Sequence, residues 1–322
     1  MFSDIGAVPN TKQNKVEQMD KKQRKHMSRR DRKQLLTGIL FIIPSAVMTA
    51  IFVVIPAFTV FYLSFTDWNG ISPHKNFVGW ANYVKLVQLN GLGTMLIATL
   101  SFAVGMTILT IVVAFAAALA LDHKGKGRLP RGFLRSAWFF PTLLSGVVVG
   151  ILWRTMYNFN NGVINKLIVA CGGKPVNWLE TVGLTNFAII FGATWARVGI
   201  CVVIFMAGLQ AIPQELYESA ALDGASARQA RKHITIPLMA PSITINMLTT
   251  SIAAYKSYEL PYLISQGRPG QTTLLIAQRI TFFAFQTNEY GRSSALAVCL
   301  ILIITVVSLI QLVVMRKRED IT

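Results

Sequence analysis

Long apolar runs alternate with shorter polar segments along this chain. Six of the runs reach the length of about 20 residues that a helix needs to cross the hydrocarbon core of a membrane. They cover residues 36–65, 95–121, 134–157, 187–209, 242–264 and 295–315. The pattern predicts an all-α, polytopic membrane protein with six transmembrane helices. We expect kinks in some of these helices, because prolines fall inside the runs at Pro44, Pro56, Pro141 and Pro261.

The composition agrees with a membrane protein. Of the 322 residues, 53% are hydrophobic, and the mean hydropathy of +0.49 is too high for a soluble domain of this length. Residues 35–315 therefore form the predicted membrane domain. Residues 1–34 are polar and basic, which predicts a disordered cytoplasmic tail, and residues 316–322 form a short second tail. The three cysteines show no spacing that is typical of metal ligands.

The basic residues indicate which side of the membrane each loop faces. The chain has a net charge of +17. Ten Lys and Arg residues lie in the amino-terminal tail, five between residues 122 and 135, three in the segment 213–237 and three at the carboxyl end, against seven in the loops on the opposite side. Cytoplasmic loops of membrane proteins are enriched in Lys and Arg. Both termini and the segment 213–237 are therefore predicted to be cytoplasmic, and the basic balance calls for no nucleic-acid partner.

The segment 213–237 is a polar island between the fourth and fifth runs, and it predicts two short helices joined by a turn. Pro213 suits the start of the first helix. Gly224 is the residue that can leave this helix with a positive φ. Ser226 can cap the second helix, and Pro237 is expected to end it at the preceding residue.

Two helices of two or three turns cannot bury their own apolar stripe. The stripe consists of Leu216, Ala220, Ala221, Ala227, Ala230 and Ile234. We therefore expect this hairpin to dock on a partner surface at the cytoplasmic face of the membrane. The alternative is an amphipathic loop that rests on lipid headgroups.

The order of residues in the hairpin resembles a known signature. Glu218-Ser219-Ala220, Asp223-Gly224-Ala225 and, further on, Ile234, Pro237 and Pro241 resemble the "E-A-A, D-G, spacer, I-x-x-P" loop of permease subunits of ATP-binding-cassette importers. Ser219 replaces the usual alanine, which exchanges one small residue for another. The resemblance implies that the loop seats in a cleft of a separate ATPase subunit. The coupling residues that it implies are Glu218, Ala220, Asp223, Gly224, Ala225 and Pro237.

The first external loop carries a second resemblance. Phe77-Val78-Gly79-Trp80, the following Asn82 and Tyr83, and the preceding Phe65-Thr66-Asp67-Trp68 are similar to the carbohydrate-uptake branch of these importers. The likeness is closer to the first than to the second of the paired permeases in that branch. It implies a type I importer fold in a bacterial cytoplasmic membrane. It also implies a heteromeric complex with a second permease, two copies of the ATPase and an extracytoplasmic sugar-binding protein.

The fifth run contains charged and aromatic side chains among its apolar ones. Lys256 and Glu259 stand three residues apart, so on a continuous helix they would share one face and could pair. Ionisable groups at mid-depth cost about 2.5 to 3.5 kcal/mol each unless they find partners or water. In the resembling family this segment contributes to the translocation path, which makes Lys256, Tyr258, Glu259 and Tyr262 the predicted substrate-path residues. The alternative is an internal Lys256–Glu259 salt bridge that holds two helices together.

Three arginines in or near the runs also require an explanation. Arg154 lies near the external interface, where a long cationic side chain can reach out of the bilayer and anchor its helix. Arg197 lies mid-span in the fourth run and requires an interior partner that the sequence does not name. Arg268 stands where the family usually has the second glycine of a "T-x-G-G-P" turn, so it either alters the turn or offers a charge to an anionic sugar.

The sequence contains no motif for catalysis. It has no GxxxxGK[ST] phosphate loop, no HExxH and no nucleophile elbow, which predicts a non-catalytic subunit without cofactor, metal or catalytic residue. The predicted substrate is a neutral oligosaccharide, with an acidic or phosphorylated sugar as the alternative. In other classes, an ion-driven secondary transporter would show inverted halves rather than a docking hairpin. A membrane enzyme for lipid-linked sugars would need facing carboxylates, for which only Glu259 is a candidate.

Overall fold

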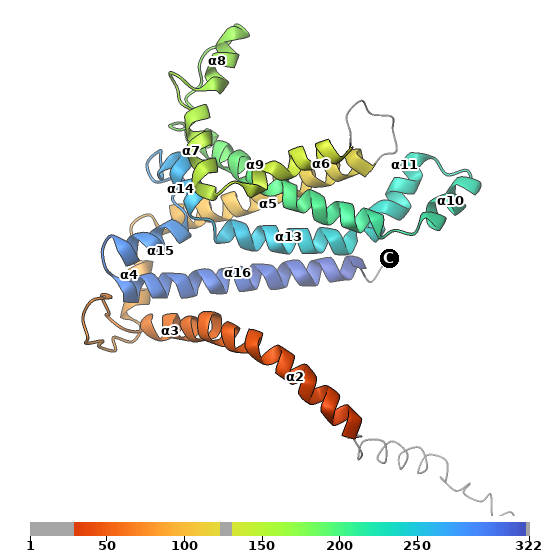
Figure 1. Cartoon of the computed structure of the whole chain (residues 1–322). Coiled ribbons are helices and arrows are strands. Elements are labelled where there is room, and N and C mark those ends of the chain that lie inside the picture. The colour runs from red at the N-terminus through yellow and green to blue at the C-terminus, as the bar shows by residue number, and fades with distance from the viewer. Residues whose placement is uncertain (1–28, 123–130, 320–322) are drawn as a thin grey trace, which may run out of the picture. The chain divides into compact units, whose positions relative to one another are not determined.

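The computed structural model describes residues 29–122 and 131–319 (Figure 1). The predicted amino-terminal tail thus lies outside the described residues up to residue 28. The chain divides into two units, residues 1–59 and 60–322, and each is described by itself.

The described residues of the first unit lie in a long apolar helix, whose last turn, from residue 60 on, belongs to the second unit. α2 (Arg29–Thr49) passes through a π-helical turn (Ala50–Val54) into α3 (Ile55–Leu63). The stretch Lys33–Leu63 is long and apolar enough to cross a membrane, and no residue of its most apolar window is buried within the described chain. A helix that is apolar on all sides requires an apolar surrounding. The π-helical turn comes just before Pro56, whose ring and missing N–H disturb the regular hydrogen bonds of the helix.

Four helices form the core of the second unit. α5 (Leu92–Asp122) packs against α9 (Leu184–Gln210), and α13 (Ala240–Tyr255) packs against both α5 and α16 (Tyr290–Glu319) (Figure 1). Small side chains line the contact of α5 with α9, where Ala114 and Ala118 are fully buried against the α9 side chains Val202 and Phe205. Small residues allow two helices in a membrane to approach closely and gain van der Waals contact.

The third predicted span is broken. α6 (Arg131–Phe139) continues as a 3-10 turn (Phe140–Leu143) and is followed by α7 (Gly146–Met156), with a bend of 99° between the two halves. Pro141 lies in the 3-10 turn, so the kink expected from proline is present. Ser145 then caps α7, because its hydroxyl accepts a hydrogen bond from the amide of Val148.

The fifth predicted span, 242–264, is not one continuous helix, which corrects the sequence-based expectation. α13 ends at Tyr255, and α14 (Glu259–Ser265) begins as a separate helix after a non-helical connection. At its other end α13 joins the helical segment Ala227–Leu238 with a bend of 57°. Among the described residues, four helices are long and apolar enough to span a membrane, and up to six if each of the two bent pairs is one span.

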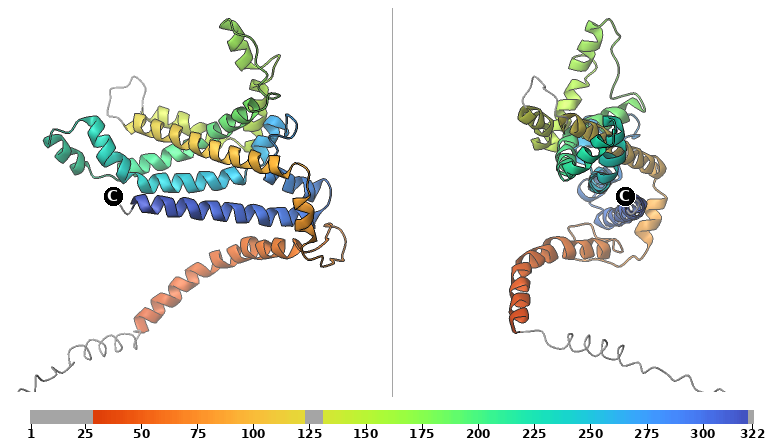
Figure 2. Two further views of the ribbon diagram at one scale, coloured as in Figure 1. Left: turned by 180° about the vertical axis from the view of Figure 1, so that it is seen from behind. Right: turned by 90° about the vertical axis from the view of Figure 1, so that its right-hand side faces the viewer.

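Shorter elements cluster at the two ends of the second unit. α4 (Ala81–Val87), α8 (Val163–Ala170) and α15 (Ile276–Phe285) lie at one end, and α10 (Gln214–Leu222) and α11 (Ala227–Ala230) lie at the other (Figures 1 and 2). At the first end, Asn82 donates hydrogen bonds to the carbonyl oxygens of Ser64 and Thr66. Asn76 donates two hydrogen bonds to the carboxylate of Asp67, which lower the pKa of that carboxyl group.

Candidate functional site

The first arm of the predicted hairpin is α10, which the structure builds as expected. It begins directly after Pro213, and Glu215 lies in its first turn, where the helix dipole favours an acidic side chain. The helix ends at Leu222 and is capped by Asp223, and Gly224 follows with a φ of +78°. The amide of Ala225 donates to the carbonyl of Ala220 at 2.9 Å, so the turn satisfies a carbonyl that the end of the helix would otherwise leave open.

The second arm begins with a reciprocal cap. The hydroxyl of Ser226 accepts from the amide of Gln229 at 3.4 Å, and the Gln229 side chain accepts from the amide of Ser226 at 2.8 Å. This confirms Ser226 as the start of α11, although the sequence reading did not identify Gln229 as its partner.

The prediction that Pro237 ends the second arm is wrong. After α11 the chain passes through a π-helical turn (Arg231–Thr235) into the short helix α12 (Ile236–Leu238) and on towards α13. Ile236 donates its amide to the carbonyl of Arg231, five residues back. This wider turn shifts the preceding carbonyls, which would clash with the proline ring in a regular α-helix. The hairpin is therefore joined to α13 by helical structure.

Much of the hairpin surface has no partner within the described chain. None of the α10 or α11 residues is buried, and Leu222 is 89% exposed. Of the predicted stripe, Leu216, Ala221 and Ala227 are exposed, whereas Ala220, Ala230 and Ile234 are half-buried. The prediction that the hairpin cannot bury its own apolar stripe is thus confirmed for Leu216, Ala221 and Ala227.

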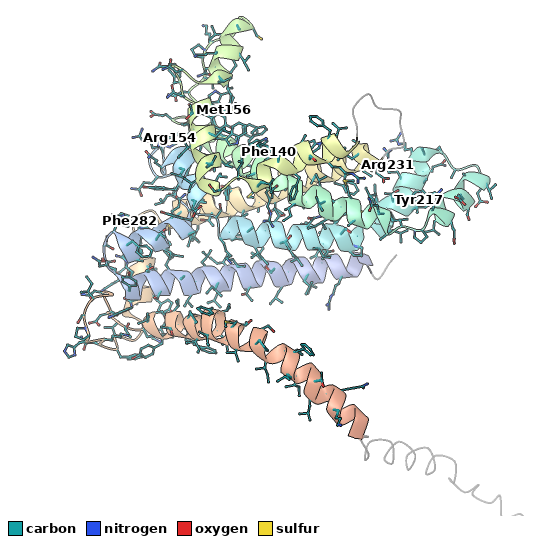
Figure 3. All side chains as sticks on the ribbon, in the orientation of Figure 1. Phe140, Arg154, Met156, Tyr217, Arg231 and Phe282 are labelled. Carbon is teal, nitrogen blue, oxygen red and sulfur yellow. The ribbon has the colours of Figure 1, made fainter. Side chains whose placement is uncertain are left out.

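A side-chain hydrogen bond joins the two arms. The hydroxyls of Tyr217 and Thr235 are 2.9 Å apart, and Figure 3 labels Tyr217 on the first arm and Arg231 on the second. Within the first arm, Gln214 donates to the carboxylate of Glu218 at 3.0 Å.

Beside α10 lies a cavity of about 940 Å³. It is lined by Asp122, Leu209, Gln210, Ala211, Ile212, Pro213, Gln214, Tyr217, Glu218 and Ala221.

The predicted substrate-path residues gather at the break between α13 and α14. Lys256 caps the end of α13, and Tyr258, Glu259 and Tyr262 belong to the start of α14. All four side chains are exposed. The rings of Tyr258 and Tyr262 stack with centroids 5.9 Å apart. Tyr255, by contrast, is 3% exposed and belongs to the core.

Lys256 and Glu259 do not form the salt bridge that the sequence left open. The ion pairs recorded among the described residues are Arg268 with Glu180 at 3.3 Å and Arg292 with Glu289 at 3.1 Å. The physical reason is the break, because residues 256 and 259 share a face only where the helix continues between them.

The structure assigns a contact to each of the three arginines. Arg197 donates to the backbone carbonyl of Thr249 on α13 at 3.3 Å. Arg154, labelled on α7 in Figure 3, donates to the side-chain oxygen of Gln266. The two atoms are 3.5 Å apart. Arg268 is held by its ion pair with Glu180, and the positive φ values of its turn fall on neighbouring residues instead: Gln266, Gly267, Gly270 and Gln271. The substitution of glycine by Arg268 therefore does not strain this turn.

Two glycines that the sequence did not single out lie where α7 packs against α14. Gly146 and Gly150 lie one turn apart on α7, on the side that packs against α14. Their spacing, with three residues between two small ones, is a known signal for close helix contact in membranes. It did not stand out in a chain that contains 23 glycines.

These observations define a class of protein, namely an all-helical membrane subunit with a broken fifth span and an exposed hairpin on one side. Residues 113–320 match the family described as "Binding-protein-dependent transport system inner membrane component". The chain belongs to this family, which confirms the resemblance found in its sequence.

Relatives and solved structures agree with the assignment. The chain is 30% identical over 283 residues to the trehalose/maltose transport system permease protein MalF of Thermococcus litoralis, covering 88% of this chain and 95% of that protein. It is 32% identical over 282 residues to the probable starch degradation products transport system permease protein AmyD of Thermoanaerobacterium thermosulfurigenes, covering 87% and 94%. A crystal structure of a bacterial ABC transporter involved in the import of the acidic polysaccharide alginate contains a similar fold, with a TM-score of 0.73 and 22% identity over 89% of this chain and 96% of that chain.

Proposed function

We propose that this chain is a permease subunit of an ATP-driven sugar importer, where it forms part of the translocation path and couples that path to a separate ATPase. The names of the relatives support the substrate class, since they transport maltose, trehalose or starch degradation products. The observation that carries the coupling role is the hairpin, which is well formed and capped although half of its apolar stripe has no partner in the described chain.

Coupling rests on the hairpin residues that match the signature. The carboxylate of Glu218 is exposed and oriented by Gln214, so it can meet a basic group on the ATPase. Gly224 sets the turn, Asp223 precedes it, and Ala220 and Ala225 keep the tip small enough to enter a cleft. Pro237 lies where the hairpin passes into α13. Docked hairpins would follow the ATPase pair when nucleotide closes it, and would switch the membrane subunits between two packings.

The translocation path runs along the break between α13 and α14. A sugar presents hydroxyl groups and an apolar C–H face, and the break offers both kinds of complement. Lys256 and Glu259 can hydrogen-bond hydroxyls, and the stacked rings of Tyr258 and Tyr262 can contact the C–H face. Irregular backbone within a membrane is tolerated where it lines a polar cavity. The irregular backbone between α13 and α14 therefore fits the lining of a translocation path better than a surface that faces lipid.

The assembly follows from the same assignment. The chain would pair with a second permease, two copies of an ATPase and an extracytoplasmic sugar-binding protein in the cytoplasmic membrane of a bacterium. Both termini and the hairpin would face the cytoplasm. No ATP hydrolysis is assigned to this chain itself.

Reconstitution in liposomes tests the proposal. The chain, its second permease, the ATPase and the binding protein are incorporated together, and uptake of a panel of labelled neutral oligosaccharides is measured. We expect uptake that requires internal ATP and is lost when the ATPase is omitted. Uptake by liposomes that contain this chain without ATPase, driven by an ion gradient, would instead establish a secondary transporter. Tyr258→Ala should abolish most of the uptake while leaving the yield of assembled complex unchanged.

A further inference from the structure

α7 and α14 pack with almost no space between them. A β-carbon added at Gly150 would lie 2.7 Å from the β-carbon of Leu263, a distance that real β-carbons do not show. A β-carbon added at Gly146 would lie 3.2 Å from Oε2 of Glu259. The two glycines therefore allow α14 to approach α7. The carboxylate of Glu259 lies next to the space that a side chain at position 146 would take.

This close approach explains how Glu259 is placed without Lys256 as a partner. No cation lies within ion-pair distance of Glu259 among the described residues. Its carboxylate instead lies beside the first turn of α7, which the break in the third span leaves open at its amino-terminal end. The amides at the start of a helix lack acceptors within the helix, and the dipole favours negative charge there. The amide of Val148 is already satisfied by Ser145.

We infer that Gly146 is a positioning residue for the substrate path. Its missing side chain lets the carboxylate of Glu259 lie against the start of α7, on the same exposed stretch as the rings of Tyr258 and Tyr262. Two broken spans thus share one function, because the break in the third span orients the acid that the break in the fifth span exposes. This inference rests on the proposed role of Glu259 in binding sugar.

Gly146→Ala is the decisive variant. An added β-carbon at 3.2 Å requires the carboxylate to move by a few tenths of an ångström, but it meets nothing else closer than the β-carbon of Glu259 itself at 3.8 Å. Alanine is also the better helix former, so the fold is not weakened. In the complete reconstituted importer we expect the KM for sugar uptake to rise about fivefold, which corresponds to the loss of one hydrogen bond between Glu259 and a sugar hydroxyl. The yield of assembled complex should stay unchanged.

A compensating variant separates positioning from packing. Glu259→Asp withdraws the carboxylate by one methylene and leaves room for the alanine β-carbon. We expect the double variant, Gly146→Ala with Glu259→Asp, to have a lower KM than the product of the two single effects predicts. Gly93→Ala is the matched control, because nothing lies within 4 Å of a β-carbon at this helical position. It should transport like the wild type.

Each outcome decides a different question. A normal KM for Gly146→Ala, together with impaired uptake by Glu259→Gln, would overturn the positioning role and leave the proposed path intact. A loss of assembled complex by Gly146→Ala that parallels its loss of uptake would also overturn it, because the glycine would then serve packing alone. Normal uptake by both Glu259→Gln and Tyr258→Ala would refute the path itself.

Discussion

At the scale of single residues, the hairpin depends on one backbone conformation. Gly224 has a φ of +78°, and nothing lies within 4 Å of the position that its β-carbon would take. A side chain at this position would therefore be strained by the backbone alone and not by its surroundings. For L-residues that strain is about 1–2 kcal/mol, and it is greatest for β-branched side chains.

Gly224→Val should uncouple ATP hydrolysis from sugar transport. Valine resists a positive φ, so the turn should distort and the two arms should no longer present the same surface to the ATPase. We expect uptake to fall by at least tenfold, measured in the reconstituted complex, with normal membrane insertion of the chain. Gly172→Val is the control, since Gly172 has a φ of +85° and equally open space but lies in a loop at the other end. Equal losses in both variants would point to general misfolding.

The charge of Glu218 should matter more for attachment of the ATPase than the charge of Glu215. Glu218→Lys should weaken attachment of the ATPase, and the weakening should depend on salt because exposed charges are screened at high ionic strength. Binding of purified ATPase to the permeases at 50 and 500 mM salt would measure it. Glu215→Lys changes the same charge one turn earlier on the same exposed helix. If it weakens attachment as much as Glu218→Lys does, no specific contact exists at Glu218.

At the scale of elements, the hairpin is stabilised by a bridge between its arms. The hydroxyls of Tyr217 and Thr235 meet at 2.9 Å, and Thr235 is buried in the π-helical turn. Tyr217→Phe removes this hydrogen bond and keeps the ring. We expect a local loss of about 1 kcal/mol, visible as faster hydrogen exchange of the α10 amides. Exchange in α5 should not change, and unchanged exchange in α10 would show that the bridge does not hold the arms together.

The sequence predicted those elements whose signals are local. The turn at Gly224 and the cap at Ser226 follow from residue types that favour these conformations wherever they occur. The break after Tyr255 could not be foreseen, because residues 255–258 contain no proline or glycine and Pro261 lies beyond the break. The contact of Gly146 with Glu259 depends on how two broken helices pack. The continuation through Pro237 depends on a π-helical turn that no sequence pattern indicated.

At the scale of the whole molecule, one helix joins the two candidate sites. The hairpin passes through its π-helical turn and a 57° bend into α13, and α13 ends at the break that exposes Lys256. A helix of 16 residues spans about 24 Å. Because α13 packs against α5, α9 and α16, we expect a displacement of the hairpin to reach the break as a movement of a packed helix. The proposed coupling would thus have a physical connection through α13, which follows the hairpin in the sequence and packs on its neighbours.

Orientation in the membrane can be tested with the cysteines that the chain already contains. Cys171 is exposed at the end of α8, whereas Cys201 is buried and Cys299 is half-buried. If the hairpin faces the cytoplasm, Cys171 lies outside, and a membrane-impermeant maleimide added to right-side-out vesicles should label it. Cys171→Ser should then remove most of the labelling. In that background a cysteine placed at the exposed Glu215 should react only after the vesicles are opened. Labelling of the Glu215→Cys variant in sealed vesicles would show that the hairpin lies outside. An external hairpin could not reach a cytoplasmic ATPase.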